Sequence, residues 1–268
     1  MKIGKQEFNT ENRCYIAGIL NVTPDSFSDG GKWNNIDNAM RHAEAMASDG
    51  ADIIDVGGES TKPGYKSITA REETDRVIPV IEAIRDAFDI PVSVDTYKSS
   101  VAQAALRAGA VMVNDIWGLK RDPDMAGVIA RAGAACCLTH NREDMRYTDF
   151  LRDILSELSK SADIALSAGI MHDKIIIDPG VGFSKTYEMN LEIINRLDIL
   201  KGLGYPVMLG VSRKSVIGAA LDLPVNERVE GSLSAAVIGV MRGCSFVRVH
   251  DVKETKRAIM MAEAILRH

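Results

Sequence analysis

Eight short apolar runs rich in valine and isoleucine recur along the chain, and they constrain its fold more than any other feature. Their apolar character is nearly continuous rather than alternating, as in strands that are covered on both faces. Strands of this kind occur in parallel sheets, so the pattern predicts a parallel sheet. The runs cover residues 15–20, 52–56, 91–94, 111–113, 135–138, 174–177, 206–209 and 246–249.

Between these runs lie helix-length segments whose apolar residues are spaced near the helical period of about 3.6. Examples are residues 37–48, 77–88, 151–167, 191–200 and 229–242. Gly133 and Gly204 each follow a helical stretch shortly before the next strand, where a left-handed helix end needs no Cβ. Strands and helices that alternate over 268 residues predict a (β/α)8 TIM barrel, which typically takes about 250 residues. We therefore expect a single domain over residues 1–268.

An open, doubly wound sheet is the alternative architecture for the same alternation of strands and helices. In a dinucleotide-binding sheet of that kind, a G-x-G-x-x-G turn follows the first strand. Here the turn reads Asn21-Val22-Thr23-Pro24, which favours the barrel.

The charge and hydropathy of the chain exclude several classes of function. A net charge of -5 and a pI of about 5.6 provide no broad positive field, so we expect no nucleic acid partner. No apolar run approaches the roughly 18 residues of a membrane span, and the N-terminal residues contain no apolar signal-peptide core. The four cysteines lack C-x-x-C spacing and are expected to be buried thiols in a reducing compartment. These features favour a cytoplasmic protein.

Polar side chains follow every predicted strand. One such residue alone could simply cap the next helix or set its turn, and we expect Asp115 and Asp251 to do so. The set also includes Lys, Arg and His, which caps do not require, and barrel active sites lie at the carboxyl ends of strands. We therefore expect one shared active site, and its candidate residues are Asn21, Asp55, Glu59, Asp95, Asn114, His140, Asp178, Ser212, Arg213, Lys214, Arg248 and His250.

The cationic candidates concentrate after the last two strands, where barrels frequently build a phosphate site. They are Lys214, Arg248 and His250. Arg248 lies inside an apolar run, where an unpaired charge is costly, so we expect it to meet an anion. This group predicts an anionic substrate.

The acidic and amide candidates predict a second kind of ligand group. A carboxylate accepts two parallel N–H groups, so Asp55, Asp95, Asn114 and Asp178 could bind a flat, donor-rich heterocycle such as a pterin or a guanine. A metal site competes for the same acids. His140 and His250 lack the short spacing of zinc ligands, whereas Asp and Asn oxygens suit Mg²⁺ held partly by a substrate phosphate. Mg²⁺ is therefore the expected metal.

Two loops, residues 23–31 and 57–64, are rich in Gly, Ser, Asp and Pro and follow the first two strands. Such loops can close over a site as lids, and the alternative is an ordinary surface turn. Each loop places an apolar residue, Phe27 or Pro63, among hydrogen-bonding residues, which favours lids.

Residues 21–31 read NVTPDSFSDGG, a highly specific match that resembles the first signature of the pterin-binding dihydropteroate synthase family. Further matching segments span the chain from the first predicted strand to the last. They are residues 55–61 (DVGGEST), 63–64 (PG), 93–96 (SVDT), 113–115 (VND), 177–180 (IDPG), 212–215 (SRKS) and 248–250 (RVH).

The resemblance implies a transferase of folate biosynthesis. Such an enzyme joins p-aminobenzoate to 6-hydroxymethyl-7,8-dihydropterin diphosphate, with Mg²⁺, and releases 7,8-dihydropteroate and diphosphate. It implies a dissociative substitution with diphosphate as the leaving group, and a homodimer. The aromatic amine is neutral at pH 7 and already nucleophilic, so we expect no dedicated general base.

The resemblance also implies roles for individual residues of this chain. The pterin would be held by Asp95, Asn114, Asp178 and Lys214. The diphosphate would be held by Asn21, Thr61, Arg248 and His250, with Asn21 also near the metal. The p-aminobenzoate would be bordered by Phe27, Pro63 and Ser215. The residues expected to act in catalysis are Asp95, Lys214 and Phe27.

Two positions depart from the family pattern. Thr139 stands where the family usually has Met, and the smaller, more polar side chain could alter packing on the pterin ring. Lys62 stands where the family often has Arg, and the lysine keeps the charge but loses bidentate geometry.

Two other functions stay open. One is a methyltetrahydrofolate-dependent methyltransferase of the same fold, although the first loop argues against it. The other is a pterin-binding relative without catalysis, which the departure at Thr139 keeps open.

Overall fold

The structure, a computed structural model, describes residues 1–23, 32–59 and 67–268. Its main sheet consists of eight parallel strands in the order β8-β7-β6-β5-β4-β3-β10-β9. A parallel bridge between Ile177 and Val207 brings the two ends of this order together, so the sheet is a nearly closed barrel. The strands are β3 (Tyr15–Asn21), β4 (Ile53–Gly57), β5 (Val92–Asp95), β6 (Met112–Asp115), β7 (Ala135–Thr139), β8 (Ile175–Asp178), β9 (Met208–Leu209) and β10 (Phe246–Val249). The predicted (β/α)8 barrel is confirmed.

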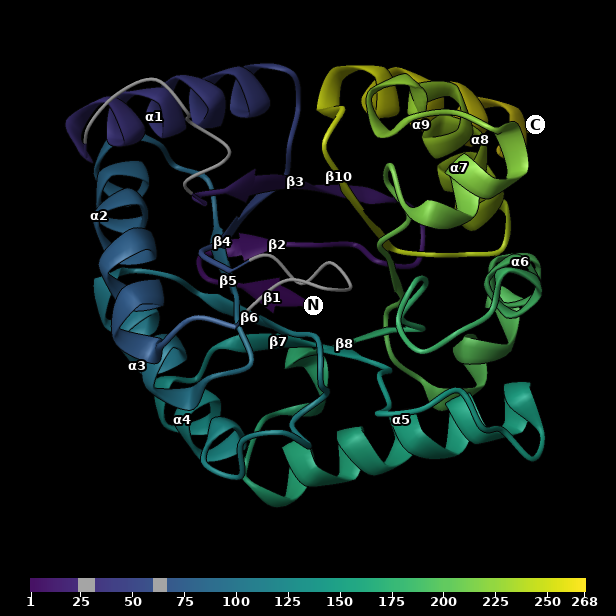
Figure 1. The fold of residues 1–268 in the computed structure, drawn as a ribbon, viewed down its shortest axis with the longest axis horizontal. Coiled ribbons are helices and arrows are strands. Elements are labelled where there is room, and N and C mark those ends of the chain that lie inside the picture. Colours follow the sequence, from purple (N-terminus) through teal and green to yellow (C-terminus); the bar gives the residue numbers. More distant parts are fainter. Residues whose placement is uncertain (24–31, 60–66) are drawn as a thin grey trace.

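Helices surround the strands as a ring (Figure 1). The helices are α1 (Lys32–Ser48), α2 (Ala70–Ala87), α3 (Ser99–Ala108), α4 (Met125–Ala132), α5 (Phe150–Ser167), α6 (Tyr187–Asn195), α7 (Ser215–Leu221), α8 (Val229–Met241) and α9 (Val252–Leu266), with 3-10 turns η2 (His172–Lys174), η3 (Leu197–Leu203) and η4 (Val225–Glu227). None of the described helices is long and apolar enough to cross a membrane.

Two of the predicted helix boundaries that differ from the structure have local causes. Helix α2 begins at Ala70 rather than near residue 77, because the side chain of Thr69 accepts a hydrogen bond from the backbone N–H of Glu72 and so caps the helix. The predicted helix over 191–200 is divided, because α6 ends at Asn195 and the chain continues as the 3-10 turn η3. Gly133 and Gly204 follow helical segments with positive φ, as predicted.

The barrel interior is apolar at its amino-terminal end. Side chains from the strands, including Ile53, Met112 and Phe246, form one buried cluster there. A hairpin that the sequence did not reveal, β1 (Lys2–Ile3) with β2 (Gln6–Glu7), adds Ile3 and the following Phe8 to the same cluster. Polar side chains are therefore left to the opposite, carboxyl ends of the strands, where the candidate site lies.

Candidate active site

Five of the predicted residues lie together at the carboxyl ends of the strands, and we call Asp55, Asp95, Asn114, Asp178 and Arg248 the strand-end cluster. Asn114 donates a hydrogen bond from Nδ2 to Oδ2 of Asp55 over 3.1 Å. Arg248 donates from Nε to Oδ2 of Asp55 over 2.5 Å and from a terminal nitrogen to Oδ2 of Asp95 over 2.6 Å. Asp178 interacts electrostatically with Arg248. The three acids and the amide are buried.

Three oxygen atoms of the strand-end cluster are buried and have no hydrogen-bond partner within the described part of the chain. They are Oδ1 of Asp55, Oδ1 of Asp95 and Oδ1 of Asn114. A buried acceptor without a donor costs about 1–3 kcal/mol. Asp95 and Asn114 are paired across β5 and β6, and Asn114 is bonded to Asp55, so the three acceptors are neighbours. They indicate a ligand that brings several N–H or O–H donors.

Burial perturbs the protonation of the site, because a charged group loses its hydration there. Burial raises the pKa of Asp95 to about 7, against the lowering effect of Arg248. The pKa of Asp178 is also raised by burial, although Lys214 opposes the shift. Burial lowers the pKa of Lys214 to about 8. For Arg248 the attraction of Asp55 and Asp95 outweighs burial and raises the pKa, so the guanidinium stays charged.

The expectation that Arg248 meets an anion is confirmed in an unexpected form. Its partners are the carboxylates of Asp55 and Asp95, which come from the predicted heterocycle-binding group. Its side chain is 18% exposed, so the ion pairs form in a largely dehydrated place. The anionic and cationic groups of the site are therefore one connected network rather than two separate halves.

The other predicted cations lie beside this network. The Lys214 ammonium donates to the backbone oxygen of Val181 over 2.5 Å and lies 4.7 Å from the centre of the Phe183 ring. The Nδ1 atom of His250 lies 3.1 Å from the hydroxyl oxygen of Ser212. The loops after β8, β9 and β10 thus contribute to one region, as predicted for the carboxyl ends of the last strands.

The remaining predicted site residues divide between described and undescribed positions. Asn21 is the half-buried last residue of β3, and Ser215 is the exposed first residue of α7. Phe27, Thr61 and Pro63 lie outside the described residues, as do Lys62 and most of both predicted lids. The roles of all these residues stay predictions.

Asp115 and Asp251 were both expected to set turns or caps, and the structure separates them. Asp115 accepts hydrogen bonds from the backbone N–H groups of Trp117 and Leu119, each over 2.8 Å, which is a turn as predicted. Asp251 precedes α9 without a side-chain cap, and its carboxylate instead pairs with Arg213. The expectation for Asp251 was wrong, because a long-range ion pair replaced the local cap. Arg213 is correspondingly a partner of Asp251 rather than a member of the strand-end cluster.

Two further candidates lie apart from the strand-end cluster. Glu59 forms an ion pair with Lys98, which also pairs with the buried Glu73, and the hydroxyl of Tyr97 donates to Glu59 over 3.0 Å. His140 is buried, with its Nε2 atom 3.2 Å from Glu157 Oε2. Both residues follow strands as predicted, but these contacts are with residues outside the strand-end cluster.

Lys185 is a buried charged residue of this region that the sequence did not single out. Its ammonium lies 2.9 Å from Nδ1 of His140 and donates to the backbone oxygens of Gly180 and Phe183 over 3.0 Å each. An ammonium has three N–H donors, so these three acceptors satisfy it. Gly180 in turn donates its N–H to Oδ1 of Asp178 over 2.7 Å. Lys185 therefore supports the turn that orients Asp178, and no local sequence signal marks it.

Replacing Gly180 with alanine is expected to lower the free energy of unfolding by at least about 3 kcal/mol. Gly180 has a φ of +71°, and a Cβ there would lie 1.9 Å from the backbone oxygen of His140. The matched control is Gly133→Ala, since Gly133 has a φ of +62° with nothing within 4 Å of its Cβ position. That variant should lose only about 1 kcal/mol in urea unfolding. Equal losses would show that the contact with His140 is not restrictive.

The fold and the site define a class of protein. It is a parallel β/α-barrel enzyme whose strands carry, at their carboxyl ends, cations and acids with oxygens that accept no hydrogen bond from the described residues. The sequence model of the pterin binding enzyme family matches residues 17–250. The dihydropteroate synthase of Clostridium beijerinckii is 57% identical over 268 residues and covers 100% of both chains, and that of Bacillus subtilis is 52% identical over 96% of this chain and 90% of its own.

Solved structures agree with these sequence relatives. A crystal structure of dihydropteroate synthase from Clostridium difficile in the presence of pteroic acid superposes with a TM-score of 0.95, at 49% identity, and covers 98% of this chain and 100% of its own. A Xanthomonas albilineans dihydropteroate synthase with 4-aminobenzoic acid has a TM-score of 0.92 at 39% identity, with 96% and 94% covered. The chain belongs to the dihydropteroate synthase family of pterin binding enzymes.

Proposed function

We propose that this chain is a dihydropteroate synthase, which joins p-aminobenzoate to 6-hydroxymethyl-7,8-dihydropterin diphosphate and releases diphosphate. The observation that carries the proposal is the set of three buried, unpaired acceptors on Asp55, Asp95 and Asn114. A pterin presents several N–H groups along one edge of a flat ring, which matches such acceptors. Relatives at 49% and 39% identity were solved with pteroic acid and with 4-aminobenzoic acid, which are the joined product skeleton and one reactant.

The pterin would lie against Asp95, Asn114, Asp178 and Lys214. The carboxylate of Asp178 can accept two parallel N–H groups of the ring, while Asn114 offers both an acceptor and donors. When the bond to diphosphate breaks, positive charge develops on the pterin. Asp95 would stabilise that charge as a carboxylate, because an oriented anion in a dehydrated site acts strongly on it. Lys214 would hold the ring from the loop after β9.

The diphosphate would be held by Asn21, Thr61, Arg248 and His250. A guanidinium has five N–H donors, and Arg248 donates one to Asp55 and one to Asp95, so it can also donate to a diphosphate oxygen. Neutralising the charge on the departing diphosphate makes it a better leaving group. Because Arg248 contacts both acids, it would link departure of diphosphate to stabilisation of the pterin.

The donor set of the described residues fits Mg²⁺ better than zinc. No group of three or more His, Cys, Asp or Glu side chains that could hold a metal occurs within residues 1–23, 32–59 and 67–268. The amide oxygen of Asn21 is a hard donor, and Mg²⁺ commonly takes one or two protein oxygens and completes its shell with substrate phosphate and water. We propose Asn21 as its protein ligand, and the bound ion would supply further charge neutralisation to diphosphate.

The p-aminobenzoate would be bordered by Phe27, Pro63 and Ser215. Its amine needs no deprotonation before attack, so these residues would position the ring rather than activate it. Phe27 is assigned to catalysis on this ground, since closing the first loop over the ring would exclude water from a cationic pterin.

The direct test incubates the purified chain with p-aminobenzoate, the pterin diphosphate and Mg²⁺, and measures dihydropteroate and released diphosphate by chromatography. Equal amounts of the two products are expected, and excess chelator should suppress the reaction. Tight pterin binding without dihydropteroate would instead identify a pterin-binding relative without catalysis. Full activity in chelator with no divalent cation would contradict the role proposed for Mg²⁺.

The affinity for the pterin is expected to rise as the pH rises through about 7. Burial raises the pKa of Asp95 to about 7, so the neutral acid dominates below this pH and the carboxylate above it. The carboxylate is acceptor-only on both oxygens, whereas the neutral acid carries an O–H donor on one of them and lacks the charge. Titrating 6-hydroxymethylpterin between pH 5 and 7.5 should show up to about tenfold weaker binding per pH unit below 7. Asp95→Asn should flatten this profile, and an unchanged profile would assign the titration to another group.

We also propose a homodimer formed through α8 and α9. These neighbouring helices carry large apolar residues that are mostly exposed: Met241 is 62%, Met261 61% and Ile265 63% exposed. Exposed apolar side chains on neighbouring elements are typical of protein interfaces, and we take the exposed side of α8 and α9 as the proposed surface. Met261→Glu is expected to shift micromolar protein towards monomer in sedimentation velocity. The control Met171→Glu changes a residue that is 58% exposed outside this surface, and a dimer unaffected by Met261→Glu would place the interface elsewhere.

The domain organisation and the location of the protein are further parts of this proposal. We propose that residues 1–268 act as one domain, because the barrel and its ring of helices run continuously from β3 to α9. We also propose a cytoplasmic location, because all four cysteines are free and buried, as is usual for proteins of a reducing compartment.

A further inference from the structure

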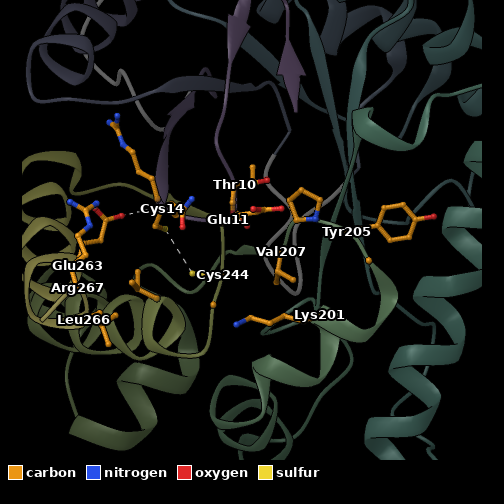
Figure 2. A pocket seen from close by; sticks show the side chains of 17 residues that line it. Thr10, Glu11, Cys14, Lys201, Tyr205, Val207, Cys244, Glu263, Leu266 and Arg267 are labelled. Carbon is orange, nitrogen blue, oxygen red and sulfur yellow. Dashed lines mark hydrogen bonds and ion pairs between the residues drawn. The ribbon is translucent and has the colours of Figure 1, made fainter.

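A cavity of about 620 Å³ lies at the end of the barrel opposite the candidate active site (Figure 2). Its walls come from segments that precede strands, namely residues 10–14 before β3, 204–207 before β9 and 243–245 before β10, together with residues at the end of α9. The proposed substrates bind at the carboxyl ends of the strands, so this cavity at the amino-terminal ends is separate from the reaction.

Two cysteines face each other in the wall of this cavity. The sulfur atoms of Cys14 and Cys244 lie 3.9 Å apart, and Figure 2 shows them pointing toward one another. The two segments are held together by the backbone, since the N–H of Tyr15 donates to the oxygen of Ser245 over 2.9 Å. Cys14 and Cys244 are only 4% and 5% exposed, but both line the cavity. A small reagent would therefore reach their sulfur atoms through the cavity.

We propose that Cys14 and Cys244 are a redox site, which a small disulfide entering the cavity converts to an intramolecular disulfide. One cysteine, as thiolate, attacks the S–S bond of the reagent, forms a mixed disulfide and expels one thiolate. The second cysteine attacks the bound sulfur of the first and expels the other thiolate. The two protons of the cysteines pass to these products. The protein is thus oxidised by two electrons, and the reagent is reduced to two thiols.

The geometry suits this bond. A disulfide needs sulfur atoms about 2.05 Å apart and Cα atoms about 4.4–6.8 Å apart. Cys14 directly precedes β3 and Cys244 precedes β10 by two residues, so the pairing of Tyr15 with Phe246 leaves the two cysteines offset by one residue. Strands about 4.8 Å apart with a rise of about 3.3 Å per residue place Cα atoms so offset about 6 Å apart, within that range. The sulfurs therefore approach by rotation of two side chains, without separation of the strands.

The bond would join the segments that precede β3 and β10, the neighbouring first and last strands of the barrel. Cys14 and Cys244 are 230 positions apart in sequence, so the bond would close most of the chain into one covalent loop. A cross-link restricts the unfolded chain more as its loop grows. We expect the oxidised protein to melt about 5–15 °C higher than the reduced protein, with unchanged synthase activity.

The reaction should be slow at neutral pH and accelerate as pH rises. The contact with Cys244 and burial raise the pKa of Cys14 well above its usual value, and the nearby carboxylates of Glu263 and Asp52 act in the same direction. The cavity also carries the cations Arg13, Lys201 and Arg267, and the acid Glu11. Because the thiolate is the nucleophile, the rate should increase about tenfold per pH unit between 7 and 9.

The test treats the full-length chain with 2-hydroxyethyl disulfide at pH 7 and 9, alkylates the remaining thiols after unfolding, and maps tryptic peptides without reduction. The expected product joins the peptides of residues 14–32 and 243–248, with a loss of two hydrogens. Cys136 and Cys137, buried outside the cavity, are internal controls and should be recovered alkylated in the peptide of residues 132–142.

Two variants separate this site from general oxidation. Cys14→Ser should abolish both the cross-link and the rise in melting temperature, whereas Cys136→Ser should leave both intact. The proposal is overturned by an absence of reaction at pH 9, by a mixed disulfide that does not resolve to the cross-link, or by equal oxidation of Cys136 or Cys137. Loss of synthase activity on formation of the cross-link would overturn the claim that the two ends are independent.

Discussion

Replacing Asp178 with alanine is expected to weaken binding of the pterin by at least about 100-fold. The residue is 5% exposed, and its Oδ1 atom accepts a hydrogen bond from the backbone N–H of Gly180. A carboxylate that accepts two ring N–H groups makes two charge-assisted hydrogen bonds, each contributing about 1.5–3 kcal/mol. Their loss corresponds to a factor of 100 or more. Isothermal titration with 6-hydroxymethylpterin measures it directly.

The matched control is Asp178→Asn, which keeps the size of the side chain and one acceptor oxygen. It should bind the pterin with intermediate affinity, because one hydrogen bond remains and the charge is lost. The variants must also be compared by melting temperature, since Asp178 helps to hold the turn at Gly180. Wild-type affinity in a folded Asp178→Ala variant would remove Asp178 from the proposed pterin site.

The barrel could be predicted because its signals are local. A strand buried on both faces reads as a short apolar run, and a polar residue such as Asp95 or Asp178 ends it at the carboxyl end of the barrel, beyond the apolar interior. In a parallel barrel all such ends point the same way, so their proximity follows from topology alone. This is why all five residues of the strand-end cluster could be identified from the sequence.

The partners of these residues could not be predicted, because they depend on the stagger of strands around the barrel. Arg248 meets Asp55 and Asp95 across separations of 193 and 153 residues. Nothing near Arg248 in the sequence distinguishes this arrangement from an arginine that awaits a substrate anion. The same limit explains Asp251, whose local position suggests a cap although its partner is Arg213.

Lys185 illustrates a different limit. A lysine in a loop is usually solvated, and its burial here depends on two separate loops, those after β7 and β8, which close around it. Burial lowers its pKa to about 7, but its three acceptors favour the charged form. We therefore regard it as an ammonium that stabilises the turn at Gly180 and so orients Asp178. This role depends on the positions of both loops in the fold.

Arg248→Ala is expected to weaken binding of the pterin diphosphate by about 100-fold or more, and binding of the pterin alone by about tenfold. The larger loss arises because the guanidinium would donate charge-assisted hydrogen bonds to the diphosphate. The smaller loss arises because Asp55 and Asp95 lose their cation, so the pKa of Asp95 rises further and its neutral form accepts fewer hydrogen bonds. The two roles proposed for Arg248 thus predict that both affinities fall, but unequally.

Titration of each variant with 6-hydroxymethylpterin and with its diphosphate, at one pH, gives the ratio of the two losses. Arg248→Lys is the control, since it keeps one charge but cannot contact Asp55, Asp95 and an anion with a planar fork. It should recover part of the pterin affinity and less of the diphosphate affinity. Both titrations should be carried out well below the melting temperature of each variant, because breaking a buried ion pair lowers the free energy of unfolding by about 3–5 kcal/mol. Equal losses for the two ligands in Arg248→Ala would mean that Arg248 organises the acids and does not bind diphosphate.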